Sequence, residues 1–103
     1  MKVQFKEWKC VVNSGYYQEG HRKAIELIEE ETGEPIATAT VNLPNYPLAE
    51  NEIFVKNYSE NEGMVLALAK AGIIEGYPLT HVKLEHVKIS SYKLTKEALE
   101  KLW

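Results

Sequence analysis

The residues of this chain that could do chemistry are its carboxylates and its three histidines. All fifteen acidic residues are glutamate, so Asp-containing triads, EF-hand loops and aspartate metal ligands cannot be built from this chain. His21, His81 and His86 lack the HxH or HExxH spacing of metal sites. A glutamate could serve as a general base, but nothing in the sequence singles one out. The sequence therefore predicts a protein that is not an enzyme, with no metal and no cofactor.

The single cysteine and the hydropathy pattern indicate where the chain works. Cys10 cannot form an internal disulfide, and it lies in a strand-like run, which predicts a buried and unreactive thiol. No apolar run approaches the ~18–20 residues of a membrane span, and the first residues lack the apolar core of a signal peptide. We expect a single cytoplasmic domain, residues 1–103, with no membrane contact.

Charge is unevenly distributed along the chain. Residues 19–62 hold ten glutamates and three basic residues, a net charge of −7, whereas the remainder holds nine lysines and five glutamates, +4. An acidic surface of this kind can steer a basic partner. The alternative is a solvated acidic edge that only confers solubility.

One segment, YSENEGMVLALAKAGII at 58–74, places two glutamates directly ahead of an apolar run. It has too few ligand types for a metal loop. Ser59 and Glu62 have the spacing of a capping box, and the apolar spacing predicts a helix over 60–71 that ends at Gly72. Gly63 is costly in a first helical turn, so we expect it to permit a close approach to a sheet or a ligand.

The rest of the chain is predicted to be mostly strand. Ile25 and Leu27 face the same side as Ala37 and Ala39 only if paired residue numbers sum to an even value, which fixes the register parity of one hairpin. Thr38 and Thr40 then face outward, and the small alanines leave room for the main helix. The expected elements are a strand over 3–18 bent near 13–15, strands at 22–29 and 35–43, a proline loop at 42–52, a strand at 53–58, one or two strands before 94, and a helix over 96–102.

These elements predict an α+β fold. We expect an antiparallel sheet of four to six strands, with one main helix packed on it and a short C-terminal helix. Thr95 is expected to cap the C-terminal helix, and Trp103 to fold back onto the body.

Two motifs in this chain carry a resemblance to a known family: TATVNLP at 38–44, chiefly Thr40–Pro44, and YSENEGM at 58–64. The chain resembles a family of small uncharacterised proteins from bacterial phages and mobile elements, over roughly residues 23–95. The resemblance implies a compact α+β domain and a mobile-element setting. It implies no catalytic residues.

The leading hypothesis is a non-enzymatic binding protein that occupies a host protein, for example a defence protein, whose surface is basic. Electrostatic steering and a polar rim would come from the acidic half, with Tyr46 as an aromatic anchor. The residues predicted to bind the partner are Glu29, Glu30, Glu31, Glu34, Tyr46, Glu50 and Glu52.

Two alternatives remain open beside it. A small ligand or nucleotide could be sequestered near the start of the main helix, by Asn57, Tyr58, Asn61 and Gly63. A single nucleic-acid strand could lie on aromatic and lysine side chains, namely Trp8, Tyr16, Tyr17, Lys2, Lys6, Lys9, Lys83, Lys88 and Lys93. The pI near 5.6 and the lone Arg22 argue against nucleic acid. A homodimer formed through an unpaired strand edge is also open.

Overall fold

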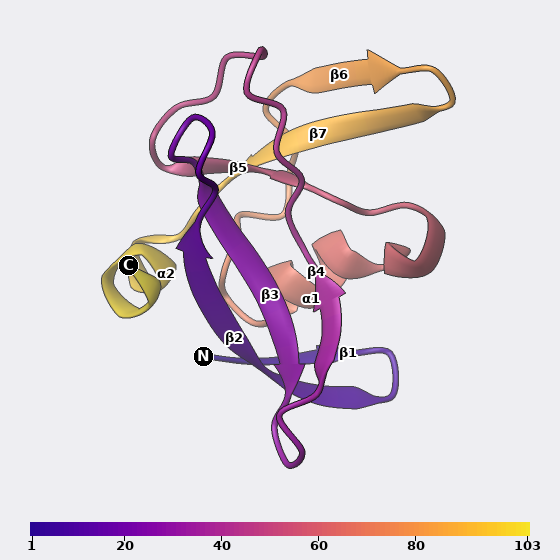
Figure 1. The fold of residues 1–103 in the computed structure, drawn as a ribbon, viewed down its shortest axis with the longest axis vertical. Helices are drawn as coiled ribbons and strands as arrows, with labels where there is room; N and C mark the ends of the chain where they lie inside the picture. The colour runs from indigo at the N-terminus through magenta and orange to yellow at the C-terminus, as the bar shows by residue number, and fades with distance from the viewer.

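The computed structural model describes residues 1–103 as two antiparallel sheets and two α-helices, drawn in Figure 1. The predicted α+β class, with a main helix and a C-terminal helix, is confirmed. The predicted single sheet of four to six strands is wrong, because seven strands form two sheets, of four and three strands. The elements in chain order are β1 (Lys2–Phe5), β2 (Trp8–Tyr16), β3 (Lys23–Glu29), β4 (Pro35–Thr38), β5 (Glu52–Val55), a 3₁₀ turn (Ser59–Asn61), α1 (Met64–Lys70), β6 (His81–Leu84), β7 (Val87–Lys93) and α2 (Lys96–Leu102).

The first sheet has the order β1-β2-β3-β4. The expected single strand over 3–18 is in fact a hairpin, in which Phe5 pairs with Trp8 across a turn at Lys6 and Glu7. Lys6 has a φ of 53°, a left-handed conformation that usually selects Gly, Asn or Asp. Because neither turn residue belongs to these types, the turn could not be predicted from the sequence.

The β3–β4 hairpin has the predicted register parity. Leu27 pairs with Ala37, and the Ala39 amide donates to the Ile25 carbonyl at 2.8 Å. Ile25, Leu27 and Ala39 are fully buried, so the even-sum pairing puts these apolar side chains on the core side. A bulge between Leu27 and Ile28 shifts the pairing by one residue near the turn.

The second sheet, β5-β7-β6, is joined to the first by residues 39–41. Thr40 forms an isolated bridge with Val55, so the chain leaves β4 and pairs with β5. The prediction that Thr38 and Thr40 both face outward is therefore right for Thr38 and wrong for Thr40. Thr40 is 3% exposed, and its hydroxyl bonds to the Tyr17 hydroxyl at 2.8 Å and accepts from the Ile25 amide.

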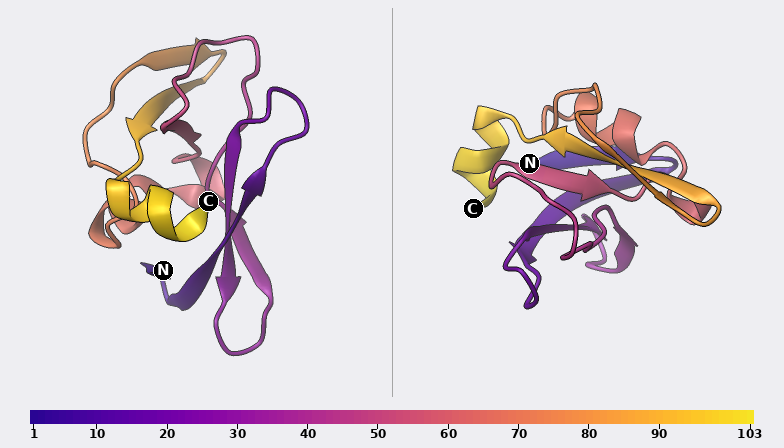
Figure 2. Two further views of the ribbon diagram at one scale, coloured as in Figure 1. Left: turned by 90° about the vertical axis from the view of Figure 1, so that its left-hand side faces the viewer. Right: turned by 90° about the horizontal axis from the view of Figure 1, so that it is seen from above.

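The main core lies between the first sheet, α1 and one face of the second sheet (Figure 2). α1 contributes Met64, Ala67 and Leu68 to this core. The strand closest to α1 is β1, not the alanine-bearing hairpin that we expected to carry it. A smaller apolar cluster around Phe54 fills the opposite face of the second sheet, beneath the proline loop.

The start of α1 differs from the predicted capping box. Ser59 has a left-handed φ of 58° and caps nothing, and α1 begins only at Met64, with Gly63 before it at φ 94°. No atom lies within 4 Å of a Cβ built on Gly63, so its backbone conformation, and not a close approach, requires glycine. The Asn57 side-chain oxygen accepts from the Val65 amide at 2.8 Å, which satisfies one free amide of the helix.

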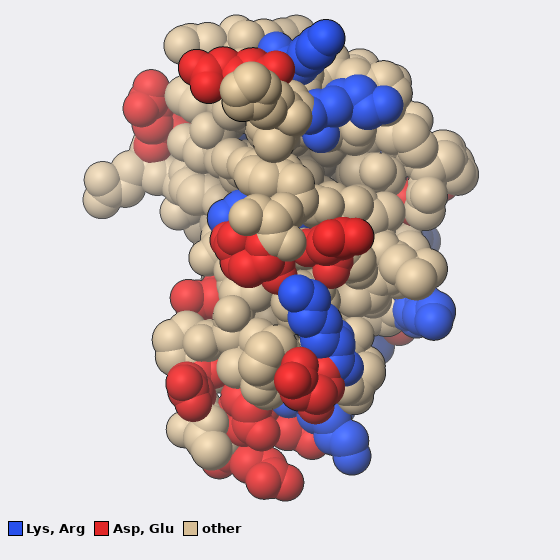
Figure 3. All heavy atoms as spheres, turned by 90° about the vertical axis from the view of Figure 1, so that its right-hand side faces the viewer, with Lys and Arg blue, Asp and Glu red and all other residues tan.

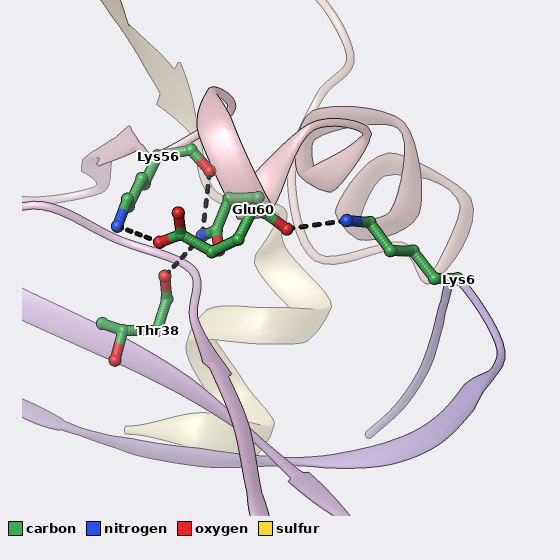
Figure 4. Close-up of polar contacts among 5 residues, drawn as sticks. Lys6, Thr38, Lys56 and Glu60 are labelled. Carbon is green, nitrogen blue, oxygen red and sulfur yellow. Dashed lines mark hydrogen bonds and ion pairs between the residues drawn. The ribbon is translucent and has the colours of Figure 1, made fainter.

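Asn61 explains why the segment before α1 bends away from a helix. Its side chain is 2% exposed and donates to the carbonyls of Thr38 at 2.7 Å and Lys56 at 3.2 Å (Figure 4). Glu60 pairs with Lys56 at 2.5 Å, and its backbone carbonyl accepts from Lys6. These bonds connect the 3₁₀ turn to both sheets. We infer that they stabilise the turn more than a capping box would stabilise a helix starting at residue 60.

Two predicted helix boundaries are confirmed, the end of α1 at Gly72 and the start of α2 at Thr95. Gly72 follows α1 at φ 76°, and the Ile73 amide donates back to the Leu68 carbonyl, as in a Schellman motif. The Thr95 hydroxyl accepts from the Ala98 amide at 3.1 Å at the start of α2. Trp103 donates its ring N–H to the Gly15 carbonyl at 3.0 Å, which fixes it on β2. Neither helix has the length and apolar character needed to cross a bilayer.

Candidate functional site

The acidic turn, Glu29–Glu34, joins β3 to β4 and is ordered by one of its own carboxylates. The Glu29 carboxylate accepts from the backbone amides of Glu31 and Thr32, each at 2.7 Å, and from the Thr32 hydroxyl. The Thr32 amide does most to lower the pKa of Glu29. Glu29 therefore orders the turn through one of its two carboxylate oxygens, Oε2.

The other glutamates of the acidic turn differ in how far they are neutralised. Glu30 lies 3.3 Å from the Lys2 ammonium of β1. Glu31 and Glu34 are exposed and have no ion-pair partner. Glu31 and Glu34 are thus the two glutamates of the acidic turn whose carboxylates have neither an ion-pair partner nor a hydrogen bond within the protein.

The proline loop, residues 42–52, is held by the only arginine of the chain. Arg22 donates through its two terminal nitrogens to the carbonyls of Leu43 and Tyr46, at 2.5 Å each. The Lys23 ammonium donates to the Glu50 carbonyl at 2.9 Å, and the Glu52 carboxylate accepts from the Ala49 amide. Glu50 and Tyr46 are exposed, Tyr46 at 39%, while Glu52 is half-buried.

The two predicted acidic regions do not form one patch. In Figure 1 the acidic turn is the lowest point of the molecule and the proline loop the highest, along the longest axis of 36 Å. Red atoms dominate the lower end of the face in Figure 3, while blue atoms lie among red ones further up. The tip of the proline loop therefore lies at the opposite end of the molecule from the acidic turn.

The alternative ligand residues near α1 are dispersed. Asn57, Asn61 and Gly63 line three different surface clefts, and Tyr58 packs against the small apolar cluster. Asn61 is already used by its two backbone bonds. The Asn57 side-chain oxygen accepts from the Val65 amide, and its nitrogen donates to no protein group. The Tyr58 hydroxyl also makes no hydrogen bond within the protein, but the two residues are not placed in one cleft.

The aromatic and lysine residues considered for nucleic acid are also dispersed. Trp8 packs on the main core, and the Tyr17 hydroxyl is bonded to Thr40. Tyr16 is 59% exposed, with the Lys23 ammonium 5.9 Å from its ring. Lys83 and Lys88 sit opposite each other on the β6–β7 hairpin. No continuous track of stacked rings and lysines results.

The histidines and the cysteine are separate from one another. No group of three His, Cys or Glu residues could hold a metal ion. Cys10 is 1% exposed, and burial, followed by the charges of Glu29 and Glu30, raises the pKa of its thiol. A ring nitrogen of His81 lies 2.6 Å from the Ser90 hydroxyl across β6 and β7.

A cleft of about 230 Å³, which was not predicted from the sequence, lies between the β6–β7 hairpin and the start of α1. We call it the hairpin cleft. Ser90, Tyr92 and Lys88 alternate along β7 and so face one side, a signal that was readable from the sequence. Their meeting with β6 and with residue 57 depends on tertiary structure. The polar residues that line the cleft are Asn57, His81, Lys88, Ser90 and Tyr92.

Comparisons of the chain with protein-family models, with curated proteins and with solved structures found no match.

Proposed function

We propose that this chain acts by binding another protein, one with a basic surface, through the acidic turn. The observation that carries the proposal is that this turn projects from one end of the molecule with two unpaired glutamates, Glu31 and Glu34 (Figures 1 and 2). A projecting charged turn can reach a concave basic site, and complementary charge raises the rate of association.

Order in the acidic turn favours the same function. Three hydrogen bonds to the Glu29 carboxylate fix the backbone of the turn before any partner arrives. Less conformational entropy is then lost on binding than with a disordered acidic loop. Glu29 is thus assigned a supporting role, and Glu31 and Glu34 the direct contacts.

The partner we propose is a host protein with a basic surface, for example a defence protein, in the phage or mobile-element setting that the family resemblance implies. The proline loop with Tyr46, Glu50 and Glu52 would lie outside this contact, because it is at the far end of the molecule. It is retained only as a secondary surface.

The test is an affinity pull-down from host lysate with three tagged proteins. These are the unaltered chain, a Glu31→Lys/Glu34→Lys variant, and a Glu19→Lys/Glu100→Lys control with the same change in net charge on exposed residues elsewhere. A basic protein retained by the chain and by the control, but lost with the turn variant, is the expected result. A partner retained equally by all three would exclude the acidic turn.

A further inference from the structure

The hairpin cleft differs in its lining from the other large clefts of the molecule. The other four each include at least one glutamate, whereas this one has none, in a chain with fifteen. Its polar groups are an ammonium, an imidazole, two hydroxyls and an amide. The absence of any carboxylate makes the cleft suited to an anion.

Several of these groups have a hydrogen-bond donor left for a ligand. The Lys88 ammonium forms no ion pair or hydrogen bond within the protein. The Asn57 side-chain oxygen accepts from the Val65 amide, which fixes the orientation of the side chain, and its nitrogen has no acceptor within the protein. In the His81–Ser90 pair, either placement of the shared proton leaves one N–H or O–H free to donate.

Tyr92 adds an independent observation. Its side chain is only 8% exposed, yet its hydroxyl makes no hydrogen bond within the protein and is not sealed from solvent. Tyr92 is one of the residues that line the hairpin cleft. Hydroxyls of largely buried tyrosines usually have a partner, and a ligand in the cleft would supply one.

The positive charge beside the hairpin cleft also favours the binding of an anion. Lys83 pairs directly with Lys88, and both side chains lie on the face of the hairpin that carries His81 and Ser90. Like charges directly opposite one another destabilise a strand pair. A bound anion would relieve this repulsion. Blue atoms lie beside red ones near the top of Figure 3, at the height where Figure 1 shows the β6–β7 hairpin.

We propose that the hairpin cleft is a binding site for a small phosphate-bearing molecule. The phosphate oxygens would accept from Lys88, Tyr92, Asn57 and the His81–Ser90 pair. The apolar side of the cleft, formed by Val55, Val65 and Pro78, would contact the organic part of the ligand. At 230 Å³ the cleft is smaller than the ~300–1,000 Å³ of sites for drug-sized ligands, which favours a small phosphomonoester.

The test is a titration of the isotope-labelled protein followed by NMR, at constant ionic strength. The probes are inorganic phosphate, ribose 5-phosphate and, as the matched compound without phosphate, ribose. We expect saturable shifts at Asn57, His81, Ser90 and Tyr92 with both phosphate compounds, tighter binding of ribose 5-phosphate, and no shifts with ribose. Shifts spread evenly over all lysines, or none at millimolar phosphate, would overturn the proposal.

Three substitutions separate the cleft from the general charge of the hairpin. Lys88→Gln should weaken binding about tenfold or more, since it removes a charged hydrogen-bond donor, and Tyr92→Phe should weaken it several-fold with little change to packing. Lys83→Gln removes the same charge from the directly opposite residue, which does not line the cleft, and should change the affinity less than about threefold. Equal losses of affinity with Lys83→Gln and Lys88→Gln would refute the proposal that the hairpin cleft is the binding site. So would tighter binding of a short oligothymidylate than of ribose 5-phosphate, because the face would then bind a nucleic-acid strand.

Discussion

Replacing Asn61 by alanine should cause one of the largest losses of stability available from a single polar residue in this protein. The Asn61 side chain is 2% exposed and joins β4 to the segment after β5 through the carbonyls of Thr38 and Lys56. Each bond contributes about 0.5–1.5 kcal/mol net, and a buried carbonyl left without a donor adds a further cost. We expect Asn61→Ala to lower the free energy of unfolding by about 2–3 kcal/mol.

For a domain of this size, that loss corresponds to a fall in Tm of roughly 8–15 °C. The assay is thermal unfolding followed by circular dichroism, with chemical denaturation to obtain the free energy. Asn45→Ala is the matched control, because Asn45 is exposed and its side chain makes no hydrogen bond; it should stay within about 0.5 kcal/mol of the unaltered protein. A Tm for Asn61→Ala equal to that of the control would refute the role of Asn61 in joining the sheets.

Three further predictions concern the same fold. Gly63→Ala should cost about 1–2 kcal/mol because of the φ of 94°, whereas Gly15→Ala, at an equally open position without a positive φ, should be close to neutral in the same denaturation assay; equal effects would contradict the conformational explanation. The hydrogen bond to Lys56 lowers the pKa of Glu60 to about 2, so the stabilisation from this pair is present at neutral pH and is lost as pH falls from about 4.5 towards 2. An NMR titration of the Glu60 carboxylate should have its midpoint near pH 2, and Lys56→Gln should move the midpoint back towards the ordinary value near 4.5. Cys10 should react with a thiol reagent only when the protein unfolds, because it is 1% exposed and burial raises the pKa of its thiol; rapid labelling under native conditions would count against this.

The parts of the fold that were predictable are those in which local chemistry and tertiary packing agree. The even-sum register of the β3–β4 hairpin followed from Ile25 and Leu27 facing small alanines, and a slip by one residue would have exposed them. α2 and the end of α1 followed from Thr95 and Gly72, whose cap geometries need no distant partner.

The parts that were not predictable depend on contacts distant in sequence. Lys6 adopts a left-handed conformation that nothing in its type suggests. Asn61, a polar residue expected at the surface, is buried because two carbonyls from other segments converge on it. Thr40 lies in the segment 35–43, which was predicted to be one strand. In the structure it leaves the first sheet and forms a bridge with Val55 of the second.

For the candidate sites, the sequence showed which residues are charged but not where they meet. The glutamates of the acidic turn and those of the proline loop are close in sequence, yet they lie at opposite ends of the molecule. The hairpin cleft gathers residues from 55 to 92, and its distinguishing feature, a lining without carboxylates, appears only once the chain is folded.

The measurement that tests the central claim most directly is the dissociation constant of the complex with the captured basic partner, at several salt concentrations. We predict that binding weakens steeply with salt, and that Glu31→Lys/Glu34→Lys weakens it by about tenfold or more at low salt, while Glu19→Lys/Glu100→Lys changes it far less. An affinity that does not depend on salt, or that falls equally in both variants, would contradict binding through the acidic turn.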